Sequence, residues 1–300
     1  MIGNGRTGGI TASARSQGEQ LLIEDFILLR SLVRERTLIS LPLSSKKQVE
    51  FRLRKKLGEN SLKDFQRYLD LLRSGEETEE YYQLIDAVTI KETRFFRNEK
   101  QFVVLETEVL PELLQATERS TLRIWSAACS TGEEAYSIAM VVDRFLATPA
   151  ARGMTVEILA SDLNREVVHR AVQGLYPKPQ VMKDVPRDFL RYFQEVSEGW
   201  MQVEEGLRRR VTFFTHNLRH PAIPVREADI IFCRNVLIYF EPEARRQVLQ
   251  RLHKALRPGG KLFLGDGETL GTIDRDRLFE PIIGKVLYYQ ASAGDVAGSG

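Results

Sequence analysis

A predicted strand that runs through a turn of small residues into a helix most constrains the fold of this chain. The sequence over residues 122–140 reads LRIWSAACSTGEEAYSIAM, in which an apolar strand leads into an amphipathic helix. Ser130 and Thr131 each have a glutamate three residues later, Glu133 and Glu134, and this spacing predicts a capping box. Strand, tight turn and capped helix together predict the first βα unit of a doubly wound sheet, where ligands bind beside the helix N-terminus.

The charge of this turn discriminates between possible ligands. It contains one glycine, Gly132, and lacks the Gly-x-Gly-x-x-Gly spacing that lets a backbone approach a pyrophosphate. Glu133 and Glu134 would repel a pyrophosphate, but they could pair with an ammonium or sulfonium group. S-adenosylmethionine is such a ligand and NAD is not. The simpler alternative, that both glutamates only cap the helix, stays open at this point.

Polar residues also follow two further predicted strands. The second strand ends in Asp162, and an acid at that position binds ribose hydroxyls in doubly wound folds. The alternative for Asp162 is to cap the helix that follows. A later apolar strand is followed by Arg234, Asn235 and Tyr239. Because the carboxyl ends of parallel strands share one edge of the sheet, these three residues are candidates for handling substrate.

The apolar pattern divides the chain into parts. Helical spacing over residues 19–90 predicts a small all-α domain with its linker, and residues 91–290 contain the α/β domain. The small and polar residues at 1–18 and 291–300 predict flexible tails.

An interruption of the α/β pattern falls within residues 176–214. Prolines bound irregular chain there, and alternating segments at 200–203 and 207–214 predict antiparallel strands. This predicts a small β insertion, which could bind a partner by strand addition, act as a lid or serve as scaffold.

A predicted helix over residues 46–57 is strongly basic. It carries Lys46, Lys47, Arg52, Arg54, Lys55 and Lys56. Such a run is often only a solvated face. The functional alternative is a docking surface for something acidic: nucleic acid, anionic lipid or an acidic protein helix.

The segment from Thr93 to Arg97 reads TRFFR. Two phenylalanines flanked by arginines do not fit an ordinary amphipathic face. They predict a segment packed over a pocket, with Arg97 offered to a carboxylate.

Composition excludes several classes of protein. There is no apolar run long enough to span a bilayer and no apolar core in the first twenty residues, so we expect neither membrane insertion nor a signal peptide. Cys129 and Cys233 are the only cysteines and lie far apart, as expected for a reduced, cytoplasmic protein. The four histidines show no metal-ligand spacing, so no metal site is expected.

Five ordered segments match one known family. They are TRFFR at 93–97, WSAACSTGEEAYS at 125–137, ASD at 160–162, NL at 217–218 and FCRNVLIYF at 232–240. Over residues 19–290 the chain resembles the CheR-type chemotaxis methyltransferases. These proteins transfer a methyl group from S-adenosylmethionine to glutamate side chains of chemoreceptors.

The resemblance implies a doubly wound, Rossmann-like α/β methyltransferase domain with a small antiparallel β insertion, preceded by a small all-α domain. S-adenosylhomocysteine and glutamate methyl esters would be the products. The implied cofactor contacts are Thr93, Arg97, Gly132, one of Glu133 or Glu134, Asp162, Asn217, Leu218, Arg234 and Asn235. The resemblance also places Arg97, Arg234 and Tyr239 near the transferred methyl. We assign the arginines to orienting the acceptor carboxylate and the tyrosine to positioning. The chain departs from the family at Lys91. Many family members have an asparagine at this position, which makes one cofactor contact.

The chemistry is consistent with this implication. A glutamate carboxylate is ionised near neutral pH, so its attack on a sulfonium methyl needs no general base. In-line positioning and exclusion of water are what catalysis requires. The basic helix Lys46–Lys56 would suit the acidic methylation helices of a receptor, and the β insertion could hold a receptor tail peptide.

Two other readings of the sequence remain. One is a methyltransferase acting on RNA, although the basic helix lacks interleaved stacking aromatics and no nucleic-acid partner is expected. The other is a non-catalytic module that senses S-adenosylmethionine or docks to receptors.

Overall fold

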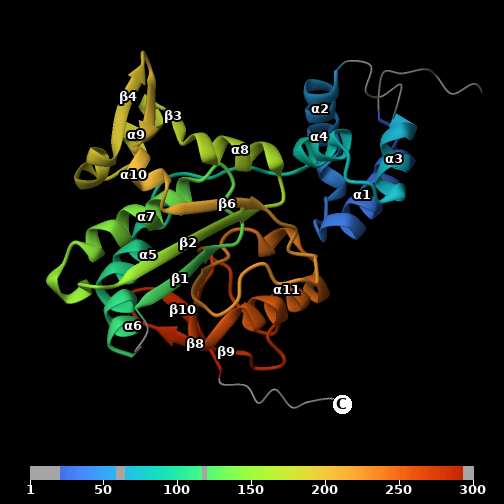
Figure 1. The fold of residues 1–300 in the computed structure, drawn as a ribbon. Coiled ribbons are helices and arrows are strands. Elements are labelled where there is room, and N and C mark those ends of the chain that lie inside the picture. The colour runs from blue at the N-terminus through green and yellow to red at the C-terminus, as the bar shows by residue number, and fades with distance from the viewer. Residues whose placement is uncertain (1–20, 59–64, 117–119, 293–300) are drawn as a thin grey trace, which may run out of the picture.

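The structure is a computed structural model, and it describes residues 21–58, 65–116 and 120–292. The predicted tail at 1–18 and most of that at 291–300 lie outside the described residues. The described chain forms an N-terminal group of helices, a central sheet covered by helices, and a small separate sheet (Figure 1). None of the described helices has the length and apolar character needed to cross a membrane.

The N-terminal helices are built around apolar side chains at helical spacing. They are α1 (Ile23–Thr37), α2 (Lys46–Leu57), α3 (Phe65–Ser74) and α4 (Glu79–Val88), with a short 3-10 turn at Leu43–Ser45. Phe26, Leu53, Leu69 and Leu84 are fully buried in one shared cluster. These helices therefore have a core of their own, as the helical spacing predicts.

The central sheet has the strand order β6-β2-β1-β7-β8-β10-β9. Its strands are β1 (Thr121–Ser126), β2 (Thr155–Asp162), β6 (Val211–Thr215), β7 (Ala228–Phe232), β8 (Leu256–Phe263), β9 (Phe279–Ile283) and β10 (Leu287–Ala291). The first five pair in parallel, and β10 is antiparallel to both β8 and β9. The order reverses between β1 and β7, and ligands of doubly wound folds bind at that crevice. The sequence analysis missed β9.

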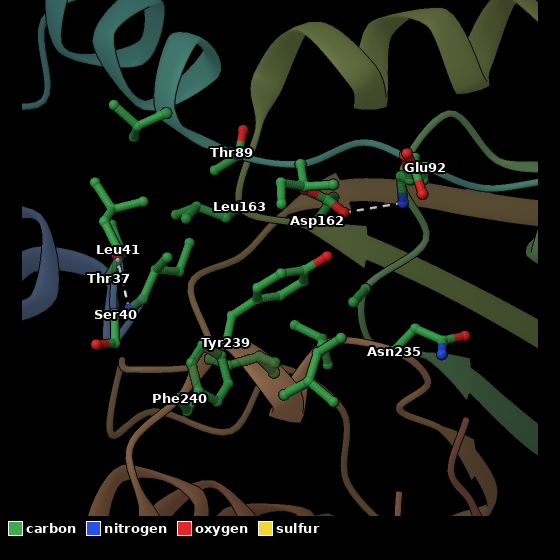
Figure 2. Close-up of a pocket in the computed structure, with 18 of the residues that line it drawn as sticks. Thr37, Ser40, Leu41, Thr89, Glu92, Asp162, Leu163, Asn235, Tyr239 and Phe240 are labelled. Atoms are coloured by element: carbon green, nitrogen blue, oxygen red, sulfur yellow. Dashed lines mark hydrogen bonds between the residues drawn. The ribbon is translucent and has the colours of Figure 1, made fainter. Parts of the chain in front are cut away.

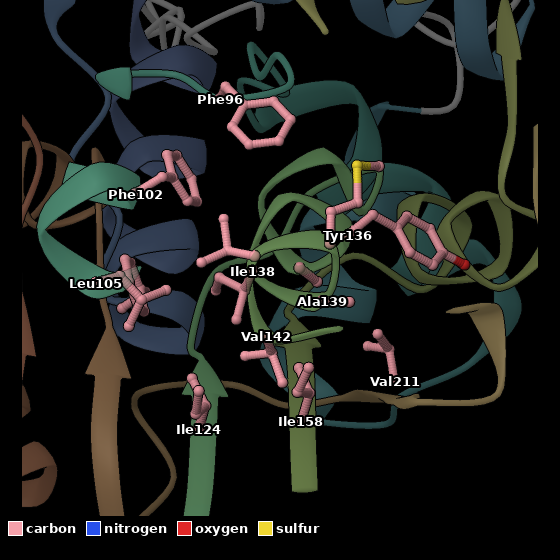
Figure 3. Packing of buried hydrophobic residues seen from close by; sticks show 14 of the residues in the cluster. Phe96, Phe102, Leu105, Ile124, Tyr136, Ile138, Ala139, Val142, Ile158 and Val211 are labelled. Carbon is pink, nitrogen blue, oxygen red and sulfur yellow. The ribbon is translucent and has the colours of Figure 1, made fainter. Parts of the chain in front are cut away.

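Alternate residues of the central strands supply two separate cores. Ile124 and Ile230 face one side of the sheet, and Trp125 and Ile231 face the other. The first face packs against α5 (Glu99–Val104), α6 (Leu110–Ala116) and α7 (Glu133–Leu146), with a π-helical segment at Leu105–Val109 (Figure 3). The second face packs against α11 (Pro242–Ala255), which has Pro242 in its first turn. The sheet is thus buried on both sides, so its polar site lies at the strand ends.

The small sheet corrects one part of the predicted β insertion. Its strands are β3 (Leu175–Pro177), β4 (Phe193–Ser197) and β5 (Trp200–Val203), all antiparallel, with α9 (Lys178–Asp184) and a 3-10 helix (Arg187–Tyr192) between β3 and β4. The predicted strand at 207–214 is not part of it. That segment comprises the end of α10 (Glu205–Arg208) and most of β6, which pairs with β2 because Val211 is buried in the main core.

The start of α7 corrects the predicted capping box. The N-cap is Gly132, with φ of 95°, and no side chain caps the helix. Thr131 donates instead to the carboxylate of Glu133 at 2.6 Å, within the turn. Glycine is needed here because a Cβ at this position would lie 2.8 Å from the Cβ of Ala171. The two glutamates are therefore available for other partners.

Candidate active site

A cavity of about 640 Å³ lies where the sheet edge meets the N-terminal helices. Its floor is formed by the carboxyl ends of β1, β2 and β7, and its other walls by residues of the helical domain and the linker at 88–97. Most residues that the sequence analysis proposed for the site line this cavity: Thr93, Arg97, Glu134, Asp162, Asn217, Leu218, Arg234, Asn235 and Tyr239. Gly132 and Glu133 do not line it.

Asp162 lies at the end of β2 on the cavity floor. One carboxylate oxygen accepts the backbone N–H of Ser130 at 2.9 Å, and the other accepts that of Asn164 at 2.9 Å (Figure 2 shows the first). Burial raises the pKa of Asp162, and these backbone donors oppose the shift. Asn164, not Asp162, caps the following helix α8 (Arg165–Gln173). The capping alternative for Asp162 is therefore wrong, and Asp162 lines the cavity.

The two adjacent glutamates of α7 have different surroundings. Glu134 lines the cavity and accepts hydrogen bonds from the Ser126 hydroxyl at 2.7 Å and from Arg234 at 3.0 Å. Glu133 accepts instead from Gln180 of α9 at 3.0 Å, and burial raises its pKa. Of the two, only Glu134 has access to a ligand in the cavity.

Arg234 is buried, and both of its terminal guanidinium nitrogens donate to protein acceptors, whereas its Nε has no hydrogen-bond partner among the described residues. Besides its ion pair with Glu134, it donates to the carbonyl of Arg97 and to the side-chain oxygen of Asn98. Its guanidinium lies over the ring of Phe102, with 5.6 Å to the ring centroid. Burial lowers the pKa of Arg234 and Glu134 opposes that shift. Arg234 thus links residues 97–98 to α7. A guanidinium held in this way is not free to orient a substrate carboxylate.

The segment from Thr93 to Arg97 packs beside the cavity and is anchored through its phenylalanines. The ring centroids of Phe95 and Tyr176 lie 4.8 Å apart, and those of Phe96 and Phe189 lie 4.7 Å apart. Neither Phe95 nor Phe96 lines the cavity. Thr93 and Arg97 line the cavity on the opposite side. Arg97 donates to the carbonyl of Glu92 at 3.2 Å, and the side chain is half-buried.

Tyr239 belongs to a 3-10 turn (Leu237–Tyr239), and its ring extends into the cavity (Figure 2). Its carbonyl accepts the backbone N–H of Ser40 at 2.7 Å, so the helical domain contacts the turn directly. Burial raises the pKa of Tyr239, and Glu92 adds to the shift. The hydroxyl therefore keeps its proton near neutral pH and can donate a hydrogen bond.

Sequence reasoning missed the contribution of the helical domain to the cavity. Ser40, Gln48 and Arg52 line it, and Arg52 also donates to the carbonyl of Thr89 at 3.2 Å. Asn217 joins the two domains by donating to the carbonyl of Arg36 at 2.8 Å. No local sequence pattern marks these residues, because the contact depends on how the domains pack.

Lys91, the departure from the family pattern, does not line the cavity. Its ammonium group forms an ion pair with Asp86 of α4. Its carbonyl accepts the hydroxyl of Ser130 at 3.1 Å, so its backbone supports the turn before α7. The side chain at this position thus serves the domain contact.

The donor set of the cavity suits S-adenosylmethionine. The carboxylate of Asp162 matches a ribose diol, and Leu163 and Leu218, which line the same cavity, match a purine face. Glu134 lines the cavity near the α7 turn, and its charge is balanced there by the ion pair with Arg234. Sheet order and cavity together fit an S-adenosylmethionine-dependent methyltransferase.

Comparison with known proteins gives the family. Residues 91–284 match the model of the CheR methyltransferase SAM-binding domain, and residues 24–89 match that of the CheR methyltransferase all-alpha domain. The chain belongs to the CheR methyltransferase family, as the sequence resemblance predicts.

Curated relatives share this assignment along most of their length. Chemotaxis protein methyltransferase 1 of Pseudomonas aeruginosa is 41% identical over 192 residues, which are 63% of this chain and 70% of that protein. The chemotaxis protein methyltransferase of Escherichia coli is 34% identical over 274 residues, 89% of this chain and 92% of that protein. Chemotaxis protein methyltransferase 2 of Vibrio cholerae is 34% identical over 252 residues, which are 83% of this chain and 86% of that protein.

Proposed function

We propose that this chain transfers a methyl group from S-adenosylmethionine to glutamate carboxylates of chemoreceptors, as part of adaptation in chemotaxis. The observation that carries the proposal is the cavity itself. It joins the strand ends of a methyltransferase sheet to residues of the helical domain, so one space can hold a cofactor on the floor and admit an acceptor side chain from outside.

On this proposal the cofactor is held by the sheet side of the cavity. Asp162 binds the ribose hydroxyls, Asn217 and Leu218 lie beside the base, and Glu134 and Thr93 face the amino-acid portion. When bound, the cofactor supplies an electrophilic methyl group on a sulfonium. We do not propose Gly132 and Glu133 as cofactor contacts, because they do not line the cavity.

The acceptor carboxylate reacts without a general base. One of its oxygens forms a bond to the methyl carbon while the carbon–sulfur bond breaks and its electron pair returns to sulfur. The chain contributes orientation and exclusion of water. We assign Arg97 to pairing with the acceptor carboxylate and the Tyr239 hydroxyl to positioning near the methyl, since both line the cavity. We now assign Arg234 to holding the 97–98 segment.

The basic helix α2 presents a narrower docking surface than its sequence predicts. Glu50 lies 3.5 Å from the Lys46 ammonium and 3.3 Å from the Arg54 guanidinium, which offsets two of the charges. Lys47 and Lys55 remain exposed, and Phe51 between them is 66% exposed. We propose that an acidic methylation helix docks on this stripe of Lys47, Phe51 and Lys55, next to the cavity wall formed by Gln48 and Arg52.

The small sheet offers a second contact for a receptor. β4 is an edge strand in the order β3-β5-β4, and the residues from Gln194 to Ser197 are exposed. An extended peptide could add to such an edge. We propose the edge of β4 as the binding place for a receptor tail peptide. Glu195 of this strand already forms an ion pair with Lys178, at 2.5 Å.

Transfer of labelled methyl from S-adenosylmethionine to receptor-containing membranes tests the function. We expect label on the receptor, lost on mild base treatment as a carboxyl methyl ester is. Base-stable label, or label that disappears with nuclease treatment, would contradict the proposal. Calorimetric binding of the cofactor without any transfer would favour a sensor module.

A further inference from the structure

Glu268, in the loop after β8, makes an unusual set of contacts for a residue outside the cavity. The side chain is buried, and Glu268 does not line the active-site cavity. One carboxylate oxygen accepts the backbone N–H groups of Asn235 at 2.6 Å and Gly265 at 2.8 Å. The other oxygen accepts the backbone N–H of Ile238 at 3.3 Å. A single carboxylate thus satisfies donors from two loops.

Two of these donors belong to the segment that carries the proposed site residues. Asn235 and Ile238 flank the start of the Leu237–Tyr239 turn, whose first N–H groups have no partner within the turn itself. A negative charge at that end of a helical turn is favourable. Glu268 therefore caps this turn from a distant part of the sequence.

The backbone around Asn235 needs such support. Asn235 has φ of 56°, a left-handed conformation that costs free energy for a residue with a side chain. Gly265 packs directly against it, since a Cβ there would lie 2.5 Å from the side-chain nitrogen of Asn235 and 2.7 Å from Glu268 Oε2. The conformation of Asn235 is thus fixed by tight packing and by the Glu268 carboxylate together.

We propose that Glu268 is a positioning residue for methyl transfer. Its carboxylate fixes the Asn235–Tyr239 segment, from which Asn235 and Tyr239 line the cavity. Glu268 acts from the far side of this segment, while the backbone N–H of Ser40 holds the Tyr239 carbonyl from the helical domain. The effect on turnover rests on the proposed function, whereas the effect on the segment does not.

Two variants and a matched control test the proposal. Glu268→Ala removes all three acceptor contacts, and Glu268→Gln keeps one oxygen and the shape if the alanine variant folds poorly. Asp274→Asn is the control, because Asp274 lies in the same loop and accepts the backbone N–H groups of Leu278 and Phe279 at 2.9 Å each, outside the cavity lining. It reproduces the loss of a carboxylate cap without touching the segment.

Hydrogen exchange followed by mass spectrometry reads the segment directly. We expect Glu268→Gln to raise deuterium uptake in peptides that cover residues 234–240, and Asp274→Asn to leave them unchanged. If Glu268→Gln and the unmodified protein take up equal deuterium in residues 234–240, the proposal is overturned. This outcome does not depend on whether the unmodified protein transfers methyl groups.

Methyl-transfer kinetics then separate positioning from stability. Because small misplacements at a reacting centre are costly, we expect kcat to fall about 100-fold in Glu268→Ala and about tenfold in Glu268→Gln, with cofactor affinity within about threefold of the original. Asp274→Asn should leave kcat unchanged, even where it lowers Tm as much as the Glu268 variants do. Equal kcat in the Glu268 and Asp274 variants, or a loss of cofactor affinity as large as the loss of kcat, would overturn it. If the unmodified protein transfers no methyl, the proposed function fails and hydrogen exchange alone decides the role of Glu268.

Discussion

The two walls of the cavity are built in different ways. On the sheet side, Asp162, Glu134 and Arg234 are each held by hydrogen bonds to the protein, and Arg234 is almost completely buried. On the helical side, Gln48 is exposed and Arg52 half-buried, and this wall continues into the exposed stripe of α2.

This difference corresponds to two kinds of ligand. A small cofactor of fixed shape is best held by side chains whose positions are fixed in advance. A protein acceptor gains more from accessible charge, which accelerates encounter and tolerates variation in sequence. We make three predictions from this difference, ordered from the largest expected effect to the smallest, and a fourth about the pH dependence of stability.

The largest effect is expected from breaking the buried ion pair on the sheet side. Arg234→Met should lower the free energy of unfolding by about 3–5 kcal/mol, because it leaves Glu134 charged and without its partner. Turnover should fall more than cofactor affinity, since the 97–98 segment loses its anchor. The double variant with Glu134→Gln should recover part of the stability in denaturant unfolding. A single variant as stable as the original would show that the pair contributes little.

Asp162→Ala should act on cofactor binding. We expect calorimetry to show a dissociation constant about 100-fold higher, equivalent to about 2.7 kcal/mol, from loss of the ribose contact. Glu157→Ala is the control, because Glu157 lies on the same strand with an exposed side chain. Equal affinities in the two variants would remove Asp162 from the cofactor site.

Charge reversal on α2 should affect the acceptor alone. Lys47→Glu with Lys55→Glu should raise the KM for receptor about tenfold at low salt and less at high salt, because the exposed charges are screened. Cofactor affinity should not change. Reversal at Lys183 and Lys254, which are exposed on other elements, is the matched control. If both pairs raise KM equally, the stripe has no specific role.

An effect of pH on stability is expected at His216, just after β6. Burial lowers the pKa of His216 to about 4, with His220 the next cause. The unfolded chain then takes up a proton near pH 6.5 that the folded chain refuses, so stability falls as pH drops from about 6.5 to 4. Replacement by Gln should flatten this part of the stability curve. An NMR titration that gives His216 an ordinary pKa would contradict the prediction.

Local patterns in the sequence predicted several of the main elements of the fold. Helical spacing and apolar runs placed the helical domain and the strands β1, β2 and β7, because each depends on residues close in sequence. Asp162, Arg234, Asn235 and Tyr239 were found because strand ends of a doubly wound sheet meet at one edge. The family segments predicted the class of enzyme and its cofactor.

The tertiary structure alone decided how neighbouring residues divide their tasks. Glu133 and Glu134 are adjacent and chemically identical, yet one meets Gln180 and the other Arg234, because successive residues of a helix point about 100° apart. The capping box failed because the hydroxyls of Ser130 and Thr131 donate instead to the Lys91 carbonyl and the Glu133 carboxylate. The roles of Arg52 and Glu268 likewise arise from contacts between distant segments, which no local pattern specifies.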